Sequence, residues 1–361
     1  MPLLPPPAIL QTSSKLLFVL LAPLKVIWQT FNLYHTLSYK VQPAQWLLVQ
    51  NPPSIPVLAV AKLVCIFRNT KLIIDWHNFG WSILALKLGR NHPLVLIAKA
   101  YEQLMSRTAT AHFAVTAAMS RMMRTKMGVN ALPLHDRPAA IFKSLDASER
   151  SKVLRRLEQT AAHTKELERG SWRLLVSSTS WTADEDFSLL LDALVGYSEK
   201  AAQDKSLPYI LAVITGKGPQ KEHYLKKIKD LSQAKKLSKA SIVTAWLSAE
   251  DYAALLGAAD LGVSLHMSSS GVDLPMKVVD MFGAGLPVVG WSKYESWPEL
   301  VKEGVNGRGF GSAQELERLL VELFSGEAKH LENLKKGALR EGLKRWDDEW
   351  NAVAGKEVFR L

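Results

Sequence analysis

The residues best suited to chemistry lie in one stretch, 266–289, where an apolar segment runs into a serine- and glycine-rich loop and then into a short helix. Free N–H groups at a helix start bind anions such as phosphate, and Lys277 adds a cation. Asp280 follows about one turn later on nearly the same helix face, where a carboxylate can accept hydrogen bonds from hydroxyl groups. This combination suits a sugar nucleotide. The candidate contacts are Ser269, Ser270, Gly271, Asp273, Lys277 and Asp280.

The elements around this stretch follow from its apolar runs and its breakers. An apolar strand over Ala259–Leu265 precedes the loop, and a helix begins at about Pro275, whose missing N–H group is not needed in a first turn. Gly283 and Gly285 end that helix before a second apolar strand over Pro287–Val289. This order of elements is typical of a parallel sheet.

The rest of the back half repeats the alternation of strand and helix. Two helices are expected to begin at the capping patterns Thr182-x-x-Glu185 and Ser248-x-x-Asp251. Further strands are expected at Trp172–Ser177, Tyr209–Thr215 and Ile242–Ala245. The pattern predicts a doubly wound nucleotide-binding domain, in which ligands bind at the carboxyl ends of the strands.

The loops after these three strands supply further candidate contacts for a nucleotide sugar. Ser178 and Thr179 offer hydroxyl and N–H groups after the first strand. Gly216 begins a tight turn after the second, and its neighbour Lys217 faces either the solvent or the ligand. Trp246 follows the third strand.

Residues before about 165 show the same alternation in a more basic context. Strands are expected at Trp46–Gln50, Lys71–Trp76 and Ala111–Val115, and helices at Ile55–Phe67, His92–Thr108 and Ala117–Met127. The helix at 92–108 is almost entirely apolar, so it should be buried. These elements predict a second parallel sheet with helices on both faces.

A polar and aromatic loop, residues 75–81, follows the second of these strands. His77 is a candidate for hydrogen bonding or acid–base chemistry, and a structural histidine bonded to its neighbours is the alternative. Asp75 and Asn78 flank it and are candidate contacts for an acceptor. The position at the carboxyl end of a strand favours a binding site.

Composition narrows the possible partners. The 361 residues, 48% of them hydrophobic, suggest two domains of ordinary size. Residues 1–145 contain 15 Lys and Arg but only three acids, which suits lipid headgroups or a phosphate-bearing substrate. Nucleic acid is not expected, because the basic residues are scattered and form no binding motif. The single cysteine, Cys65, excludes an internal disulfide and a cysteine-based zinc site.

The amino-terminal residues raise the question of membrane contact. No segment reaches the roughly 20 apolar residues that span a bilayer, and residues 1–30 lack the features of a signal peptide. The Pro-rich start is expected to be extended or disordered. Residues 16–31 carry a helical apolar stripe that fits either a core helix or an interfacial helix resting on a membrane.

Several of these motifs resemble one family. Residues 268–282, Ser-Ser-Ser-Gly-Val-Asp-Leu-Pro-Met-Lys-Val-Val-Asp-Met-Phe, resemble the donor-sugar loop of GT-B glycosyltransferases. More narrowly, they resemble the β-mannosyltransferases that add the first mannose to the dolichol-linked oligosaccharide of N-glycosylation. Similar segments are Gln50–Pro53, Asp75–Asn78, Gly216–Pro219 and His135–Pro138, the last of which is alternatively a plain linker turn. The resemblance covers roughly residues 45–361.

The resemblance implies an α/β chain of the GT-B fold, with two Rossmann-like domains facing a cleft and the first domain incomplete. The expected parts are a Pro-rich start and amphipathic helix (1–45), a partial acceptor-side domain (46–165), a nucleotide-sugar domain (166–330) and a C-terminal helix (331–361). That helix either crosses back to the first domain or packs on its own. The family's initial strand, Gly-rich turn and membrane anchor are not found before Leu16, so a shortened form is expected.

The family's reaction is transfer of mannose from GDP-mannose to N,N′-diacetylchitobiosyl-diphosphodolichol with inversion, giving a β-1,4 linkage. Direct displacement needs a base for the acceptor hydroxyl and stabilisation of the leaving diphosphate. We expect Lys277 and the N–H groups of residues 269–271 to stabilise the diphosphate and Asp280 to bind the ribose. His77 and Asp273 are both candidates for the base, and the backbone near Trp246 is expected to hold guanine.

The resemblance also implies the surroundings of the reaction. The expected partners are the dolichol-linked disaccharide, the membrane surface and other early mannosyltransferases of the pathway, on the cytosolic face of the endoplasmic reticulum membrane. No obligatory protein-bound metal is expected, because no Asp-x-Asp metal clamp of the usual kind is evident.

Two departures from the family pattern leave alternatives open. The Arg and Lys that related enzymes carry near Ser178 are absent, and Asp273 and Asp280 are seven residues apart, closer than in many GT-B enzymes. The alternatives are a GT-B enzyme with another sugar nucleotide, either a transferase or an epimerase, and a shortened form that binds nucleotide or partners without turnover.

Overall fold

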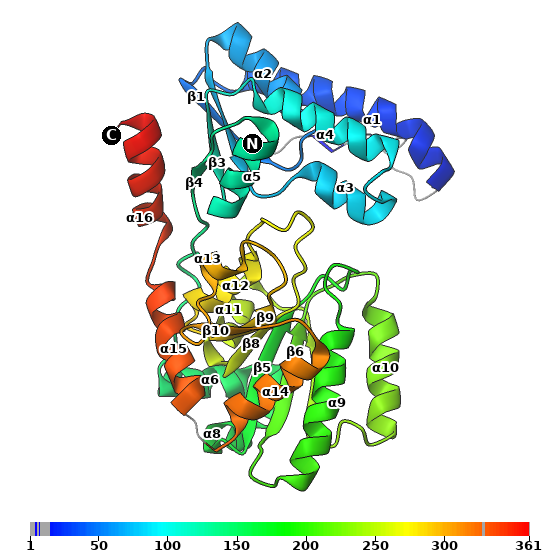
Figure 1. The fold of residues 1–361 in the computed structure, drawn as a ribbon, viewed down its shortest axis with the longest axis vertical. Helices are drawn as coiled ribbons and strands as arrows, with labels where there is room; N and C mark the ends of the chain where they lie inside the picture. Colours follow the sequence, from blue (N-terminus) through cyan, green and yellow to red (C-terminus); the bar gives the residue numbers. More distant parts are fainter. Residues whose placement is uncertain (1–3, 6, 8–14, 327–328, 361) are drawn as a thin grey trace. The chain divides into compact units, whose positions relative to one another are not determined.

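A computed structural model of the chain describes residues 4, 5, 7, 15–326 and 329–360 (Figure 1). The chain divides into two compact units, Met1–His135 and Asp136–Leu361. The boundary lies earlier than the one expected near residue 165. The intervening helices α6 (Ala147–Arg156), α7 (Glu158–Ala161) and α8 (Thr164–Arg169) pack on elements of the second unit.

The first unit contains a parallel four-stranded sheet in the order β1-β2-β3-β4. Its strands are β1 (Trp46–Asn51), β2 (Lys71–Trp76), β3 (Ala111–Ala114) and β4 (Leu132–Pro133). The first three confirm the predicted strands, because each is a short apolar run between breakers. The two-residue β4 was not predicted.

Helices cover this sheet. They are α1 (Lys15–His35), the π-helix η2 (Thr36–Lys40), α2 (Val57–Arg68), α3 (Gly80–Leu88), α4 (Pro93–Ser106) and α5 (Ala117–Met127). Helix α5 has the predicted bounds because its ends are well marked. The Thr116 side chain accepts a hydrogen bond from the Met119 N–H group, and Gly128 ends the helix with φ of 68°.

The prediction that the helix at 92–108 is buried was wrong. Only one face of α4 is buried, through Val95, Ala98, Glu102 and Ser106. The opposite face exposes Leu94, Leu96, Ile97 and Leu104, with Ile97 and Leu104 each 60% exposed. A largely apolar composition predicts burial only where the fold supplies a partner on both sides, and here one side has none in the described chain.

Helix α1 confirms a helix in the region of the predicted stripe. Leu24, Ile27 and Phe31 are exposed, so this part of the stripe does not form a core. The stripe residues Leu16, Leu17 and Leu20 and most of the Pro-rich start lie outside the described side chains. Among the helices that the structure describes, none is long and apolar enough to cross a bilayer.

The second unit is built on a parallel six-stranded sheet in the order β10-β9-β8-β5-β6-β7. Its strands are β5 (Trp172–Ser178), β6 (Tyr209–Thr215), β7 (Ala240–Ala245), β8 (Leu261–Ser264), β9 (Val288–Trp291) and β10 (Gly307–Phe310). This confirms the predicted doubly wound domain. Strand β10 escaped prediction because its sequence, Gly-Arg-Gly-Phe, has no apolar run.

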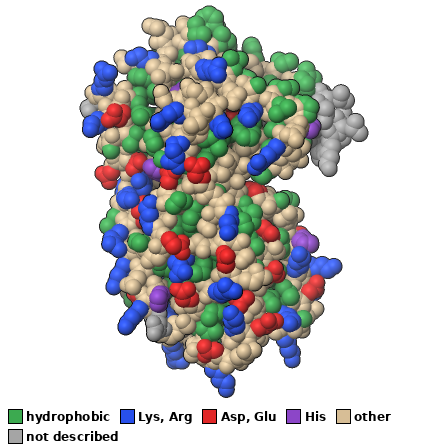
Figure 2. Space-filling model, in the orientation of Figure 1, with side chains coloured by type: hydrophobic (Ala, Val, Ile, Leu, Met, Phe, Trp, Pro, Cys, Tyr) green, Lys and Arg blue, Asp and Glu red, His purple; other side chains and the backbone are tan. Residues whose placement is uncertain are grey.

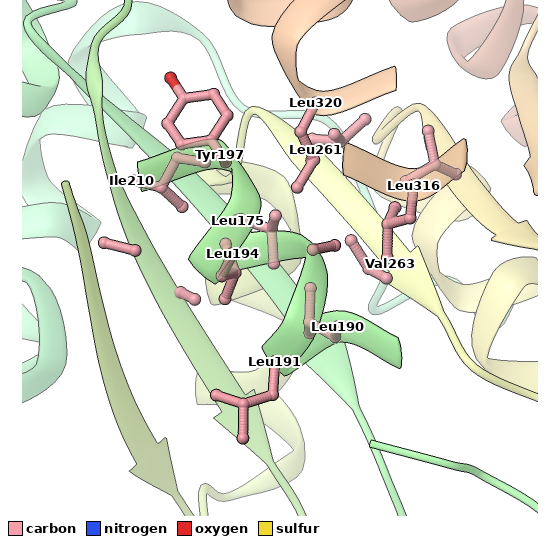
Figure 3. Packing of buried hydrophobic residues seen from close by; sticks show 14 of the residues in the cluster. Leu175, Leu190, Leu191, Leu194, Tyr197, Ile210, Leu261, Val263, Leu316 and Leu320 are labelled. Atoms are coloured by element: carbon pink, nitrogen blue, oxygen red, sulfur yellow. The ribbon is translucent and has the colours of Figure 1, made fainter. Parts of the chain in front are cut away.

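The remaining helices surround this sheet. They are α9 (Ser188–Gln203), α10 (Lys221–Gln233), α11 (Ala249–Ala258), α12 (Met276–Gly283), α13 (Trp297–Leu300), α14 (Ala313–Phe324), α15 (Lys329–Gly342), α16 (Trp346–Trp350) and the π-helix η3 (Asn351–Phe359). Figure 3 shows the core between α9, α14 and the strands. Leu190 and Leu194 of α9, Leu316 of α14 and Val263 of β8 point toward one another and are fully buried there.

Of the two helix starts predicted from capping patterns in this unit, one was confirmed and the other was wrong. Ser248 caps α11 as predicted, accepting a hydrogen bond from the Asp251 N–H group at 3.1 Å. The pattern Thr182-x-x-Glu185 starts no helix, since α9 begins only at Ser188. The C-terminal region is largely helical as expected, with a short interruption at 343–345 between α15 and α16.

The segment after the unit boundary holds the C-terminal helices in place. The Arg137 guanidinium donates to Glu341 of α15 at 3.1 Å and to Glu349 of α16 at 2.9 Å. Residues 135–138 are therefore more than a plain linker turn.

Candidate functional site

A cavity of about 580 Å³ opens at the carboxyl ends of β5, β6 and β7. Seven predicted residues line it: Ser178, Thr179, Gly216, Lys217, Trp246, Lys277 and Asp280. Six further residues also line it: Ser180, Thr215, Leu247, Ser248, Ala249 and Tyr252. The parallel sheet explains why residues far apart in sequence meet, since its strand ends share one edge.

Two glycines allow the loops around the cavity to approach closely. Gly216 has φ of 131°, and a Cβ atom there would lie 1.8 Å from the backbone oxygen of Thr179. A Cβ atom on Gly218 would lie 1.7 Å from the backbone oxygen of Ser180. Only glycine fits at these positions, so the Gly-Lys-Gly turn fixes the spacing between the loops after β5 and β6.

The floor of the cavity carries a chain of hydroxyl groups. The Ser178 hydroxyl lies 2.9 Å from the Tyr252 hydroxyl and accepts from Thr215 at 3.1 Å. Burial raises the pKa of Tyr252 to about 12, so its hydroxyl stays protonated and able to donate. Tyr252 lies one turn after the Ser248 cap of α11, a position that the sequence analysis did not consider.

Lys277 enters the cavity from α12 and forms an ion pair with Glu185. The Glu185 side chain is 5% exposed and that of Lys277 30% exposed. Glu185 also accepts a hydrogen bond from the Ser180 N–H group. Burial alone would raise the pKa of Glu185, but the Lys277 charge and the hydrogen bonds outweigh it and hold that pKa below its ordinary value. Sequence reasoning placed Glu185 at a helix start and missed this role.

Asp280 lines the same cavity, one turn beyond Lys277. Burial raises its pKa from 3.8 to about 7. Its side chain is therefore poised between a neutral and a charged form near neutral pH. A ligand that donates hydroxyl hydrogens to it would favour the carboxylate.

At the rim, the Lys217 ammonium lies 4.1 Å from the centre of the Trp246 ring. The Trp246 side chain is 64% exposed. A cation over an exposed aromatic face is held weakly, so both groups remain within reach of a ligand. Lys217 thus lies beside the cavity rather than away from it.

The serine loop before α12 is arranged differently from the expectation. Asp273 is buried, with Oδ2 3.1 Å from His266 Nε2 and with Oδ1 accepting from the Ser268 hydroxyl. The Gly271 N–H group donates to the Ser268 hydroxyl at 2.7 Å, so it is not free in this structure. Neither Asp273 nor residues 269–271 line the cavity. Their roles stay predictions.

The predicted acceptor-side residues lie at the carboxyl end of β2 in the first unit. His77 Nε2 lies 3.0 Å from Asp75 Oδ2, so a carboxylate orients the imidazole. Asn78 Oδ1 accepts from the Phe79 N–H group at 2.8 Å and from the Ser82 hydroxyl at 3.2 Å, which ties it to the start of α3. An oriented histidine can accept a proton, and the acceptor-side roles of Asp75, His77 and Asn78 stay predictions.

The class of protein follows from the two parallel sheets and from the cavity, with its lysine and hydroxyl groups, at the strand ends of the second sheet. Residues 159–341 match the family "Glycosyl transferases group 1". The solved structure of HepE from Anabaena, in complex with UDP and glucose, is similar with a TM-score of 0.65 and 15% identity. That match covers 97% of this chain and 84% of that one. The chain therefore has the GT-B fold and is a glycosyltransferase that uses a sugar-nucleotide donor.

Curated relatives narrow the class. A chitobiosyldiphosphodolichol beta-mannosyltransferase from Arthroderma benhamiae is 53% identical over 97% of this chain and 79% of that protein. One from Yarrowia lipolytica is 46% identical over 97% and 73%. A relative named UDP-glycosyltransferase TURAN, from Arabidopsis thaliana, is 39% identical over 96% and 83%. The chain belongs to the chitobiosyldiphosphodolichol beta-mannosyltransferase family.

Proposed function

We propose that this chain transfers mannose from GDP-mannose to chitobiosyl-diphosphodolichol, with inversion to a β-1,4 linkage. The observation that carries the proposal is the cavity of the second unit, where Lys277 and Asp280 of one helix face the hydroxyl groups of two strand ends. This arrangement suits a nucleoside diphosphate sugar. Membership of the family supports mannose as the sugar and chitobiosyl-diphosphodolichol as the acceptor.

The side chains in the cavity divide the work of donor binding. Lys277 stabilises the negative charge that develops on the leaving diphosphate, because a fixed cation in a partly buried site acts strongly on charge. Asp280 accepts hydrogen bonds from the ribose hydroxyls. Trp246 and the backbone after β7, beside Lys217, bind the guanine ring of the donor.

The acceptor hydroxyl needs a base, and His77 is the candidate that we favour. Asp75 orients its imidazole, which is the arrangement that activates a histidine. Both oxygens of Asp273 already accept hydrogen bonds from His266 and Ser268, so its carboxylate is less available. Asp273 then serves to shape the loop before α12.

The name of the relatives supports a lipid-linked acceptor. We therefore propose that the enzyme works at the cytosolic face of the endoplasmic reticulum membrane, beside other early mannosyltransferases of the pathway. No obligatory protein-bound metal is part of this proposal. The part of the chain that the structure describes contains no group of three or more His, Cys, Asp or Glu side chains that could hold a metal ion.

A second candidate is a transferase that uses a uridine nucleotide, which the name of the Arabidopsis relative favours. Calorimetric titration of the full chain with GDP, GDP-mannose, UDP and UDP-N-acetylglucosamine separates the two. We expect binding of the guanine nucleotides alone. Preference for the uridine nucleotides would overturn the proposed donor.

A further inference from the structure

The hairpin of helices α3 and α4 exposes an aliphatic surface that the described chain leaves uncovered. We define this surface as the hairpin face; it consists of Ile83, Leu86, Leu88, Leu94, Leu96, Ile97 and Leu104, all of them exposed. Large exposed apolar patches on soluble domains mark interaction sites. The face contains only Leu and Ile, whereas protein–protein interfaces are enriched in aromatic residues.

The two helices pack against each other, so their exposed residues belong to one rigid hairpin. Ile83 and Leu84 of α3 line a small cavity of about 280 Å³ together with Ala98 of α4. The Lys99 ammonium of α4 lies 5.2 Å from the centre of the Trp81 ring of α3. The inner side of α4 is buried against the unit through Val95, Ala98 and Glu102. Its outer side therefore points away from the unit.

The charges around the hairpin face have one sign. The first unit contains 13 Lys and Arg but only two acids, Asp75 and Glu102. Glu102 is 1% exposed, and the Asp75 side chain is 13% exposed and paired with His77. The first unit therefore exposes almost no negative charge. Exposed basic residues beside the hairpin face are Lys87, Arg90, Lys99 and Arg107.

We propose that the hairpin face rests on the surface of a bilayer that contains anionic phospholipids. The aliphatic side chains enter the boundary between headgroups and acyl chains, while Lys87, Arg90 and Lys99 reach the phosphates. A second copy of the chain fits less well, because two strongly basic units would repel each other. Figure 2 shows green hydrophobic and blue basic side chains side by side on the upper unit. The inference rests on the proposed function only in that a lipid-linked acceptor requires work at a membrane.

Flotation with vesicles tests this directly, using the full chain and lipids without any acceptor. The first vesicles contain phosphatidylcholine alone and the second phosphatidylcholine with phosphatidylinositol. The variant Leu96→Asn/Ile97→Asn removes two aliphatic contacts. Its matched control is Val305→Asn/Leu343→Asn in the second unit, where Leu343 is 73% exposed. The variant Lys87→Gln/Arg90→Gln has the control Lys226→Gln/Lys229→Gln on α10, which removes the same charge.

We expect the wild type to bind the anionic vesicles preferentially. Leu96→Asn/Ile97→Asn should weaken that binding about 20-fold, because each substitution removes roughly half of the free energy of transferring a buried aliphatic side chain out of water. Lys87→Gln/Arg90→Gln should weaken it about 20-fold on anionic vesicles only. Both controls should bind as the wild type does.

Other outcomes would overturn the inference. They are binding that no variant changes, equal losses in a variant and its control, or no binding by a wild type that still binds GDP. So would a wild-type dimer, seen by light scattering, that Leu96→Asn/Ile97→Asn dissociates. Thermal melting of each variant separates misfolding from lost contact. Because the vesicles carry neither donor nor acceptor, a failure of the proposed mannosyl transfer would leave this result intact.

Discussion

Replacing Lys277 by Met tests whether this side chain holds the donor diphosphate. The change keeps the length of the side chain but removes its charge. A hydrogen bond to a charged group contributes about 1.5–3 kcal/mol, so the affinity for GDP should fall roughly 10- to 150-fold. Affinity for guanosine, which has no phosphate, should stay unchanged. Calorimetry with the two ligands measures both.

The same substitution should also lower stability, because it leaves the buried Glu185 carboxylate without its cation. Breaking a buried ion pair lowers the free energy of unfolding by about 3 to 5 kcal/mol. We expect the smaller loss here, because Lys277 is partly exposed. The pKa of Glu185 is held below its ordinary 4.5, so the pair stabilises the fold above that pH and loses this effect as pH falls through the folded value. The loss in Tm should therefore shrink in acid.

A double variant separates the two effects. Lys277→Met/Glu185→Gln removes the buried charge as well, so it should recover most of the lost stability while GDP affinity stays low. Unchanged GDP affinity in Lys277→Met would refute the assigned role. An equal loss of guanosine affinity would mean that the cavity is disrupted rather than deprived of one cation.

Three further predictions concern other parts of the site. Gly216→Ala should lower the free energy of unfolding by at least about 2 kcal/mol in urea, while Gly326→Ala, with no atom near its Cβ position, should change little; equal effects would contradict the close approach to Thr179. The neutral Asp280 side chain stabilises the fold fully below pH 3.8, and this contribution is lost as pH rises through about 7. Asp280→Asn should therefore match the wild type in acid and exceed its stability above pH 7, by at most about 4 kcal/mol; the same difference at both pH values would refute the raised pKa. His77→Gln should lower kcat of mannosyl transfer about 100-fold or more without changing GDP binding, and Asp273→Asn should lower kcat less. A larger loss of kcat in Asp273→Asn than in His77→Gln would assign the role of catalytic base to Asp273.

Much of the fold could be predicted because local signals agree with tertiary structure. Strands such as Lys71–Trp76 and Tyr209–Thr215 are apolar runs between breakers, and α5 carries a cap at each end. The cavity residues at strand ends followed from one property of parallel sheets, that ligands bind at their carboxyl edge.

What failed depends on contacts that sequence does not display. Glu185 matched a capping pattern, but its partner Lys277 is 92 residues away. Helix α4 carries apolar residues on both its inner and its outer face, and only the fold shows that the described residues leave the outer face uncovered. Tyr252 lies in the cavity beside the Ser178 hydroxyl, and the helical pattern of α11 alone does not predict this contact.

Transfer of radiolabelled mannose from GDP-mannose to a chitobiosyl-diphospho-lipid is the most direct test of the central claim. We predict a trisaccharide-lipid product that β-mannosidase cleaves and α-mannosidase does not. Lys277→Met should form this product far more slowly. Absence of product from a chain that binds GDP-mannose, or a product cleaved by α-mannosidase, would contradict the account.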